Sequence, residues 1–174
     1  MRDAQPRTIF LKDYEAPAYA IKHTDLHFEL FDEHTLVHSE LRFERTEGAA
    51  ADAVLELNGV DLELLKLAID GRELGSDDYE LGDECLRICD VPASGVLTST
   101  VRLLPQDNTS LEGLYRSRGL FCTQCEAEGF RKITWFPDRP DVMSTYRVTI
   151  DGDRDACPEM LSNGNPVASE DLGD

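Results

Sequence analysis

Apolar residues recur at every second position along much of this chain, and this period of two is what most constrains its fold. The alternation covers residues 26–30, breaks at Asp32 and Glu33, and resumes over residues 37–43. A period of two places apolar side chains on one face of a strand, and a short polar break between two such runs is typical of a β-hairpin. The sequence therefore predicts a hairpin at this point.

The same alternation returns further along the chain, between residues that favour tight turns. More strands are predicted over residues 53–57, 65–69, 79–81, 86–88, 97–103, 132–136 and 145–150. Asn58-Gly59 and Asp70-Gly71 are dipeptides suited to the positive φ angles of tight turns. No stretch has a convincing amphipathic helical pattern. The chain is therefore predicted to be all-β, a β-sandwich or saddle-like multi-sheet domain with antiparallel and mixed strands and few or no helices.

Length and charge limit the number of domains and the class of partner. A chain of 174 residues suits a single β-rich domain, here residues 1–174, that buries a core of its own. Residues 1–20 show no sustained period and are expected to form an irregular leader. The formal net charge is −18, from 35 acidic and 17 basic residues. This charge argues against nucleic acid as a partner, because phosphate binding needs a basic surface.

The sequence also indicates where the protein resides. No apolar run approaches the roughly 20 residues of a membrane helix, and the amino terminus lacks the apolar core of a signal peptide. The chain has five cysteines, an odd number at irregular spacing. We therefore expect a reduced, cytoplasmic setting and no membrane partner.

Residues 121–131 bring together two cysteines, a glutamine, two carboxylates and an arginine. Gln124 and Glu126 lie two residues apart in a segment expected to be extended, so their side chains would project to the same face. An amide oxygen beside a carboxylate suits an ammonium group, which carries three donors and one positive charge. The same spacing is common in strands, and a solvated polar edge explains it equally well.

Cysteines and histidines offer weaker candidates. Cys122 and Cys125 are three residues apart and would point to opposite faces of an extended segment, so buried free thiols are expected rather than a zinc cluster or redox pair. His27 and His38 would lie opposite each other on the polar face of the predicted hairpin. They could hold an adventitious metal, although solvated imidazoles are the commoner outcome. No His-Glu-x-x-His occurs, and no metal site is predicted.

A motif at residues 123–131, Thr-Gln-Cys-Glu-Ala-Glu-Gly-Phe-Arg, is accompanied by further stretches along nearly the whole chain. These include Asp13-Tyr14, Leu57-Asn58-Gly59 and residues 108–115, 138–142 and 161–165. Together, and in this order, they resemble the amino-terminal domain of the zinc aminopeptidase N family, of the bacterial cytosolic alanyl aminopeptidase type. The run from residue 108 to residue 131 carries the resemblance most specifically.

The resemblance implies a multidomain peptidase in which this β-rich domain docks on a thermolysin-like catalytic domain of the same chain. Such an enzyme removes neutral or basic amino-terminal residues from peptides, with a zinc-activated water and a glutamate general base. Gln124 and Glu126 match the family's Gln-x-Glu pair, which binds the free α-amino group of the substrate. An N-blocked substrate would leave Glu126 a buried charge without a partner, which is costly.

Other family motifs do not occur in the sequence. They are the Gly-x-Met-Glu-Asn loop, the His-Glu-x-x-His zinc helix with its distant glutamate ligand, and the transition-state tyrosine. The catalytic and helical domains are therefore expected beyond residue 174, and this chain is expected to be an inactive fragment that binds no zinc and supplies no catalytic residue. Arg131 and Asp138 are expected to form a structural pair. The alternative is a stand-alone β-sandwich that binds or scaffolds without catalysis.

Overall fold

Two long strands form the framework of the protein, whose computed structural model describes residues 10–173. Strands β1 (Tyr19–Leu30) and β2 (Thr35–Arg45) pair antiparallel along almost their whole length. The chain turns between them, where the amide of Phe31 donates to the carbonyl oxygen of His34 at 3.0 Å. The predicted hairpin is therefore confirmed.

Strand β1 begins within the stretch expected to be an irregular leader. Its pairing with β2 shifts register between Ile21 and His23. Two residues instead of one therefore separate the buried side chains of Ile21 and Thr24, which hides the period of two in the sequence. Before β1 the structure has the 3-10 turn η1 (Leu11–Asp13), and residues 1–9 lie outside the described part of the chain.

Four further strands complete a six-stranded sheet in the order β11-β1-β2-β8-β4-β5. They are β4 (Glu63–Ile69), β5 (Arg72–Glu73), β8 (Ser94–Leu103) and β11 (Thr145–Gly152). Strand β11 runs parallel to β1, whereas the other neighbours in this sheet are antiparallel. The prediction of an all-β fold with antiparallel and mixed strands is confirmed.

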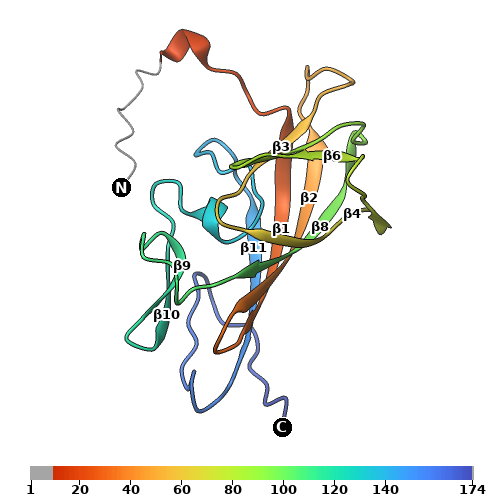
Figure 1. The fold of residues 1–174 in the computed structure, drawn as a ribbon. Helices are drawn as coiled ribbons and strands as arrows, with labels where there is room; N and C mark the ends of the chain where they lie inside the picture. The colour runs from red at the N-terminus through yellow and green to blue at the C-terminus, as the bar shows by residue number, and fades with distance from the viewer. Residues whose placement is uncertain (1–9, 174) are drawn as a thin grey trace.

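Two smaller sheets accompany the large one. A three-stranded sheet has the order β3-β7-β6, and a two-stranded hairpin joins β9 to β10. Their bounds are Leu55–Asn58 for β3, Tyr79–Leu81 for β6, Cys85–Ile88 for β7, Gly113–Ser117 for β9 and Leu120–Gln124 for β10. The three-stranded sheet lies across one face of the six-stranded sheet, and the β9–β10 hairpin projects to one side (Figure 1).

The hydrophobic core lies between the six-stranded and three-stranded sheets. Val37 and Val101 enter it from the large sheet, and Leu57 and Leu86 enter it from the small one, each with no exposed surface. Complete burial of such a side chain stabilises the fold by roughly 1.5–3 kcal/mol. The opposite face of the large sheet is polar, so its strands alternate between buried apolar and partly exposed polar positions.

The strand predicted over residues 132–136 is wrong. Phe130–Lys132 form the 3-10 turn η2, and Phe136 makes an isolated bridge to Asn58. Residues 133–137 are all buried, so this apolar run packs as irregular chain and does not alternate between core and solvent. A Cβ atom at Gly59 would collide with the Trp135 ring, so the glycine makes room for the indole.

Helical structure is confined to the short turns η1 and η2 within residues 10–173. Neither approaches the length or the apolar character that a bilayer-spanning helix requires.

Candidate functional site

The Gln124–Glu126 pair lies where the β9–β10 hairpin ends. Strand β10 ends at Gln124, which pairs with Gly113 of β9, and Glu126 begins a turn that continues to Gly129. Alternation along a strand therefore describes Gln124 but does not extend to Glu126. The expectation that both lie in one extended segment is wrong, and a turn determines how Glu126 is presented. The role predicted for the pair stays a prediction.

Two glycines allow this turn to pack closely. The amide of Gly129 donates to the carbonyl oxygen of Cys125 at 2.9 Å, which closes the turn. A Cβ atom at Gly129 would collide with the carbonyl oxygen of Gln124. Gly113 has a φ of +70°, and a Cβ atom there would collide with the side chain of Lys132. Because these two positions have no side chain, the hairpin packs closely against η2, and the turn packs closely against the end of β10.

Gln124 and Glu126 are exposed, and their side chains have no hydrogen-bond or ion-pair partner within residues 10–173. The charged residues around them are paired. Lys132 Nζ lies 3.0 Å from a Glu112 carboxylate oxygen, and Glu128 Oε2 lies 3.4 Å from Arg131 Nη2. The two residues predicted to bind an ammonium group are therefore ones whose acceptors are unused.

Arg131 and Asp138 form the expected pair beneath the turn. Arg131 Nε lies 3.0 Å from Asp138 Oδ2, and their side chains expose 19% and 12% of their surface. The backbone amide of Arg131 donates to the same carboxylate oxygen at 3.1 Å. Partial burial with several charge-assisted hydrogen bonds is the environment in which an ion pair fixes geometry. The prediction that these residues pair is confirmed.

Cys125 lies between the two candidate residues, and its surroundings differ from theirs. Burial raises the pKa of its thiol, and the nearby Asp138 carboxylate raises it further. Tyr146 borders the same place, and burial, followed by the charges of Asp138 and Cys125, raises the pKa of its phenol. Cys125 is thus partly buried, whereas Gln124 and Glu126 on either side of it are exposed.

All five cysteines are free. The expectation that Cys122 and Cys125 are buried is only half right, because both are partly exposed. Cys122 Sγ has only a weak contact of 4.0 Å with the carbonyl oxygen of Leu120. The two thiols belong to different surroundings because β10 ends between them, which the assumption of a continuous extended segment missed.

The polar face of the large sheet is a second candidate region. His27 and His38 pair directly across β1 and β2, as predicted, and their ring centroids are 5.6 Å apart. His27 Nε2 lies 2.7 Å from Asp151 Oδ2, and His38 Nε2 lies 3.3 Å from Glu29 Oε2. Within residues 10–173 no three His, Cys, Asp or Glu side chains are grouped to hold a metal ion.

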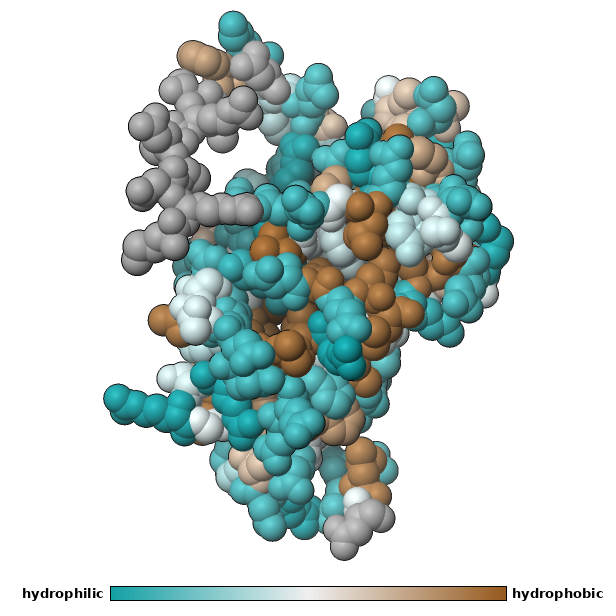
Figure 2. Space-filling view, viewed as in Figure 1, coloured by the Kyte–Doolittle hydropathy of each residue, from teal (hydrophilic) through white to brown (hydrophobic). Residues whose placement is uncertain are grey.

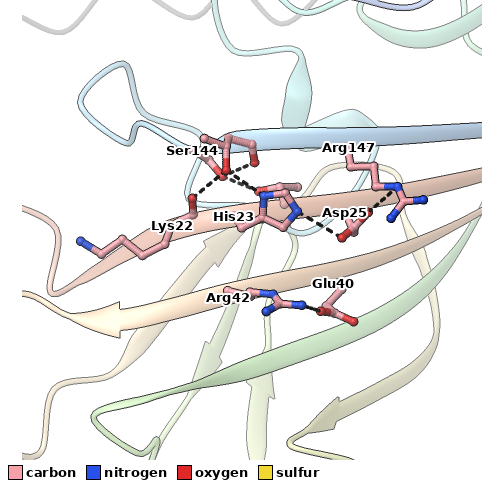
Figure 3. A network of polar contacts seen from close by, with 9 residues as sticks. Lys22, His23, Asp25, Glu40, Arg42, Ser144 and Arg147 are labelled. Carbon is pink, nitrogen blue, oxygen red and sulfur yellow. Dashed lines mark hydrogen bonds and ion pairs between the residues drawn. The ribbon is translucent and has the colours of Figure 1, made fainter. Parts of the chain in front are cut away.

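The same face holds strand β11 in place (Figure 3). His23 contacts Thr145 Oγ1 at 2.7 Å through Nδ1 and Asp25 at 3.2 Å through Nε2. Arg147 of β11 reaches across to Asp25 at 3.9 Å. The polar groups of β1 and β11 therefore bond to one another, and this network supports the parallel pairing of two strands that are far apart in the sequence.

A groove of about 610 Å³ lies beside the start of β9, and the sequence did not predict it. Its apolar lining includes the side chains of Leu81 and Leu104, which are 54% and 50% exposed, together with the buried Trp135. Apolar residues gather in the middle of one face of the molecule, with hydrophilic residues around them (Figure 2). No periodic pattern marks this groove, because strand residues and loops that are far apart in the sequence form it.

Comparisons with known proteins agree with the motif at residues 123–131. Residues 94–174 match the family model described as the peptidase M1 N-terminal domain. The chain is 49% identical over 172 residues to aminopeptidase N of Caulobacter vibrioides, which covers 99% of this chain and 20% of the relative. It is 41% identical over 168 residues to aminopeptidase N of Escherichia coli, which covers 97% of this chain and 19% of the relative.

Solved structures show the same fold. The chain superposes on aminopeptidase A of Legionella pneumophila, solved with aspartic acid, with a TM-score of 0.85 and 30% identity over 93% of this chain and 19% of that one. An M1 zinc metallopeptidase from Deinococcus radiodurans, bound to a Tyr-Ser-Ala substrate, gives a TM-score of 0.62 at 16% identity over 76% of this chain and 32% of that one. The chain spans about a fifth of the length of the curated relatives it matches.

Proposed function

Because the chain belongs to the family of peptidase M1 amino-terminal domains, we propose that it serves a longer zinc-dependent aminopeptidase that removes amino-terminal residues from peptides. In this proposal Gln124 and Glu126 bind the free α-amino group of the substrate. The five free thiols support a reducing, cytoplasmic setting for the enzyme.

One observation carries the proposal: within residues 10–173, Gln124 and Glu126 have unused acceptors among neighbours that are already paired. A substrate ammonium group offers three donors and a positive charge, which an amide oxygen and a carboxylate can accept together. A substrate with a blocked amino terminus offers no charge to Glu126. The pair would therefore favour free amino termini and make the enzyme an exopeptidase.

The proposal also includes docking of this domain on a catalytic domain. The groove lined by Leu81, Leu104 and Trp135 supports it, because an apolar surface beside the β9–β10 hairpin is suited to association with protein. A catalytic domain seated there would lie next to the hairpin that ends at Gln124. The amine-binding pair would then stand at the boundary between the two domains, where substrate sites commonly form.

Zinc in this proposal is held outside the residues described here. Residues 10–173 contain no group of three His, Cys, Asp or Glu side chains suited to a metal ion, so we assign them no zinc ligand. When bound in the enzyme, zinc would polarise the scissile carbonyl and activate water. The residues of this chain would bind and orient the amino terminus of the peptide.

Kinetics of the longer enzyme test the proposal. Glu126→Gln keeps the size of the side chain and removes its charge. We expect kcat/KM for an aminoacyl substrate to fall roughly 100-fold, about 2.7 kcal/mol, because the ammonium loses a charge-assisted contact. Glu47→Gln is the matched control and should leave kcat/KM unchanged, because Glu47 is an exposed glutamate in a turn that is distant from Glu126 in the sequence. Equal kinetics for Glu126→Gln and the control would reject the amine-binding role.

A further inference from the structure

Arg131 joins the turn that carries Glu126 to two other segments of the chain. Its Nε atom and backbone amide donate to Asp138 Oδ2 at 3.0 and 3.1 Å, and its Nη2 donates to the Asp138 carbonyl oxygen at 3.0 Å. Nη2 also lies 3.4 Å from Glu128 Oε2, inside the turn. The carbonyl oxygen of Arg131 accepts from the amide of Val60 at 2.9 Å, just after β3.

Asp138 is itself held by the edge of the three-stranded sheet. Its backbone amide donates to Asn58 Oδ1 at 3.1 Å, and Asn58 exchanges backbone hydrogen bonds of 2.8 and 3.1 Å with Phe136. Asn58 is the last residue of β3, so the backbone of Asp138 is bonded to the end of a core strand. A rigid element supports a site more accurately than a loop does.

The charges in this cluster are distributed unequally. Arg131 is the cation for both Glu128 and Asp138, whereas Glu126 has no cation within residues 10–173. Of these three carboxylates, Glu126 is therefore the one without a cationic partner in the described part of the chain. A guanidinium held by several directed contacts cannot turn towards that charge without giving them up.

We propose that Arg131 and Asp138 are positioning residues for Glu126, which binds the substrate amine in the proposed function. They fix the turn at residues 126–129 to β3, and they keep the guanidinium away from Glu126 so that its carboxylate stays free for the substrate. The inference rests on the proposed function, because it concerns how that same site binds an amine. The inference adds that residue 131 must supply the planar, forked donors of a guanidinium, and that a positive charge alone is not enough.

The first test is kinetic and uses the longer enzyme. Arg131→Lys keeps the charge but loses the planar fork. We expect it to raise KM for an aminoacyl substrate roughly tenfold, since a small displacement of a binding group weakens every contact that depends on it. Added to Glu126→Gln, it should have no further effect, because it acts through Glu126. Val101→Ala, in the core of β8, controls for lost stability and should leave KM unchanged.

The second test uses the 174-residue chain and hydrogen exchange. In Arg131→Lys the amide of Gly129, which bonds to Cys125, should exchange several-fold faster, while amides paired between β1 and β2 keep their rates. A structural role without positioning would predict kinetic effects of Arg131→Lys and Glu126→Gln that add. Additive effects, or a wild-type KM in Arg131→Lys, would overturn the inference.

The two proposals fail in different ways. If Glu126→Gln leaves kcat/KM unchanged, the amine-binding role is rejected and the positioning role with it. If Glu126→Gln lowers kcat/KM but Arg131→Lys keeps the wild-type KM, only the positioning role is rejected. A raised KM in Arg131→Lys that disappears in the Glu126→Gln background supports both.

Discussion

The polar face of the large sheet and the turn after β10 both present charged groups to solvent, but they use those groups differently. On the sheet, His27 is bonded to Asp151, and His38 is bonded to Glu29. On the turn, Gln124 and Glu126 have no partner within the described residues. The sheet has more titratable groups, yet the turn has the free acceptors.

This difference separates polar groups that support the fold from polar groups that are available to a ligand. His23 and His27 join β1 to β11, and His38 is bonded to Glu29, so a ligand that used these histidines would have to replace contacts already made. The turn requires no such exchange, because no residue within 10–173 occupies the side-chain acceptors of Gln124 and Glu126. The proposed site is therefore distinguished from the histidine face by side chains without described partners and not by a high density of functional groups.

The largest expected loss of stability comes from breaking the pair beneath the turn. Asp138→Ala would leave the partly buried guanidinium of Arg131 with Glu128 as its remaining carboxylate. We expect the free energy of unfolding to fall by about 2–3 kcal/mol, because an underpaired charge in a poorly solvated place is costly. Urea denaturation of the 174-residue chain measures it. A loss below about 0.5 kcal/mol would place Asp138 with the weak surface pairs.

The reactivity of Cys125 sharpens the contrast between the base of the turn and its surface. Burial, and secondarily Asp138, raise the pKa of this thiol, so less of it is thiolate near pH 8. Alkylation of Cys125 should be several-fold slower than alkylation of the exposed Cys89, as measured by mass spectrometry of labelled peptides. Equal rates at the two thiols would mean that the base of the turn is open to solvent.

The raised pKa of Cys125 also makes the free energy of unfolding depend on pH. The folded-state pKa of Cys125 lies above the unfolded value, which is about 8.5 for a free thiol. The stability that this group contributes is therefore complete below about pH 8.5 and declines as the pH rises through the folded-state pKa. Cys125→Ser raises the side-chain pKa out of this range, so the difference in unfolding free energy between the two proteins should shrink in alkali.

Breaking a contact on the polar face should cost less. His27→Ala removes the 2.7 Å contact with Asp151, but both side chains expose more than a third of their surface. Solvent screens such a pair, and we expect a loss of about 0.5 kcal/mol in urea denaturation. Lys22→Ala is the control, since its 3.4 Å contact with Glu44 is more exposed and should contribute less. A loss above 2 kcal/mol for His27→Ala, well beyond the range of exposed pairs, would mark this face as the main support of β11.

Local sequence patterns predicted the polar face of the large sheet better than the turn after β10. The pairing of His27 with His38 followed from a short polar break between alternating runs, because a tight turn fixes the register of a hairpin. Asp151 as a partner of His27 could not be predicted, since β11 reaches β1 by parallel pairing across more than a hundred residues. Such pairing depends on tertiary packing, and no local period records it.

The candidate site was found by its motif, while its geometry was not. The alternation over residues 132–136 suggested a strand, but η2 ends at Lys132, and residues 133–137 are buried as irregular chain. In this region Trp135 packs against Gly59, and Arg131 pairs with Asp138. The resemblance of the motif thus pointed to Gln124 and Glu126 as candidates, and the structure presents Glu126 on a turn.

The smallest stability effect is expected at the two candidate residues themselves. Gln124→Ala truncates an exposed side chain and Glu126→Gln removes the charge of another, and neither side chain has a partner among residues 10–173, so the free energy of unfolding should change by less than about 0.5 kcal/mol. With Glu126→Gln it should rise slightly if repulsion from the overall charge of −18 matters at this position. Thermal and urea unfolding of the 174-residue chain measure both. A substitution that leaves the free energy of unfolding unchanged but strongly lowers kcat/KM in the enzyme indicates a residue that binds a ligand and does not support the fold. A loss above 1 kcal/mol would instead show that the pair has a structural partner, and the contrast with the histidine face would disappear.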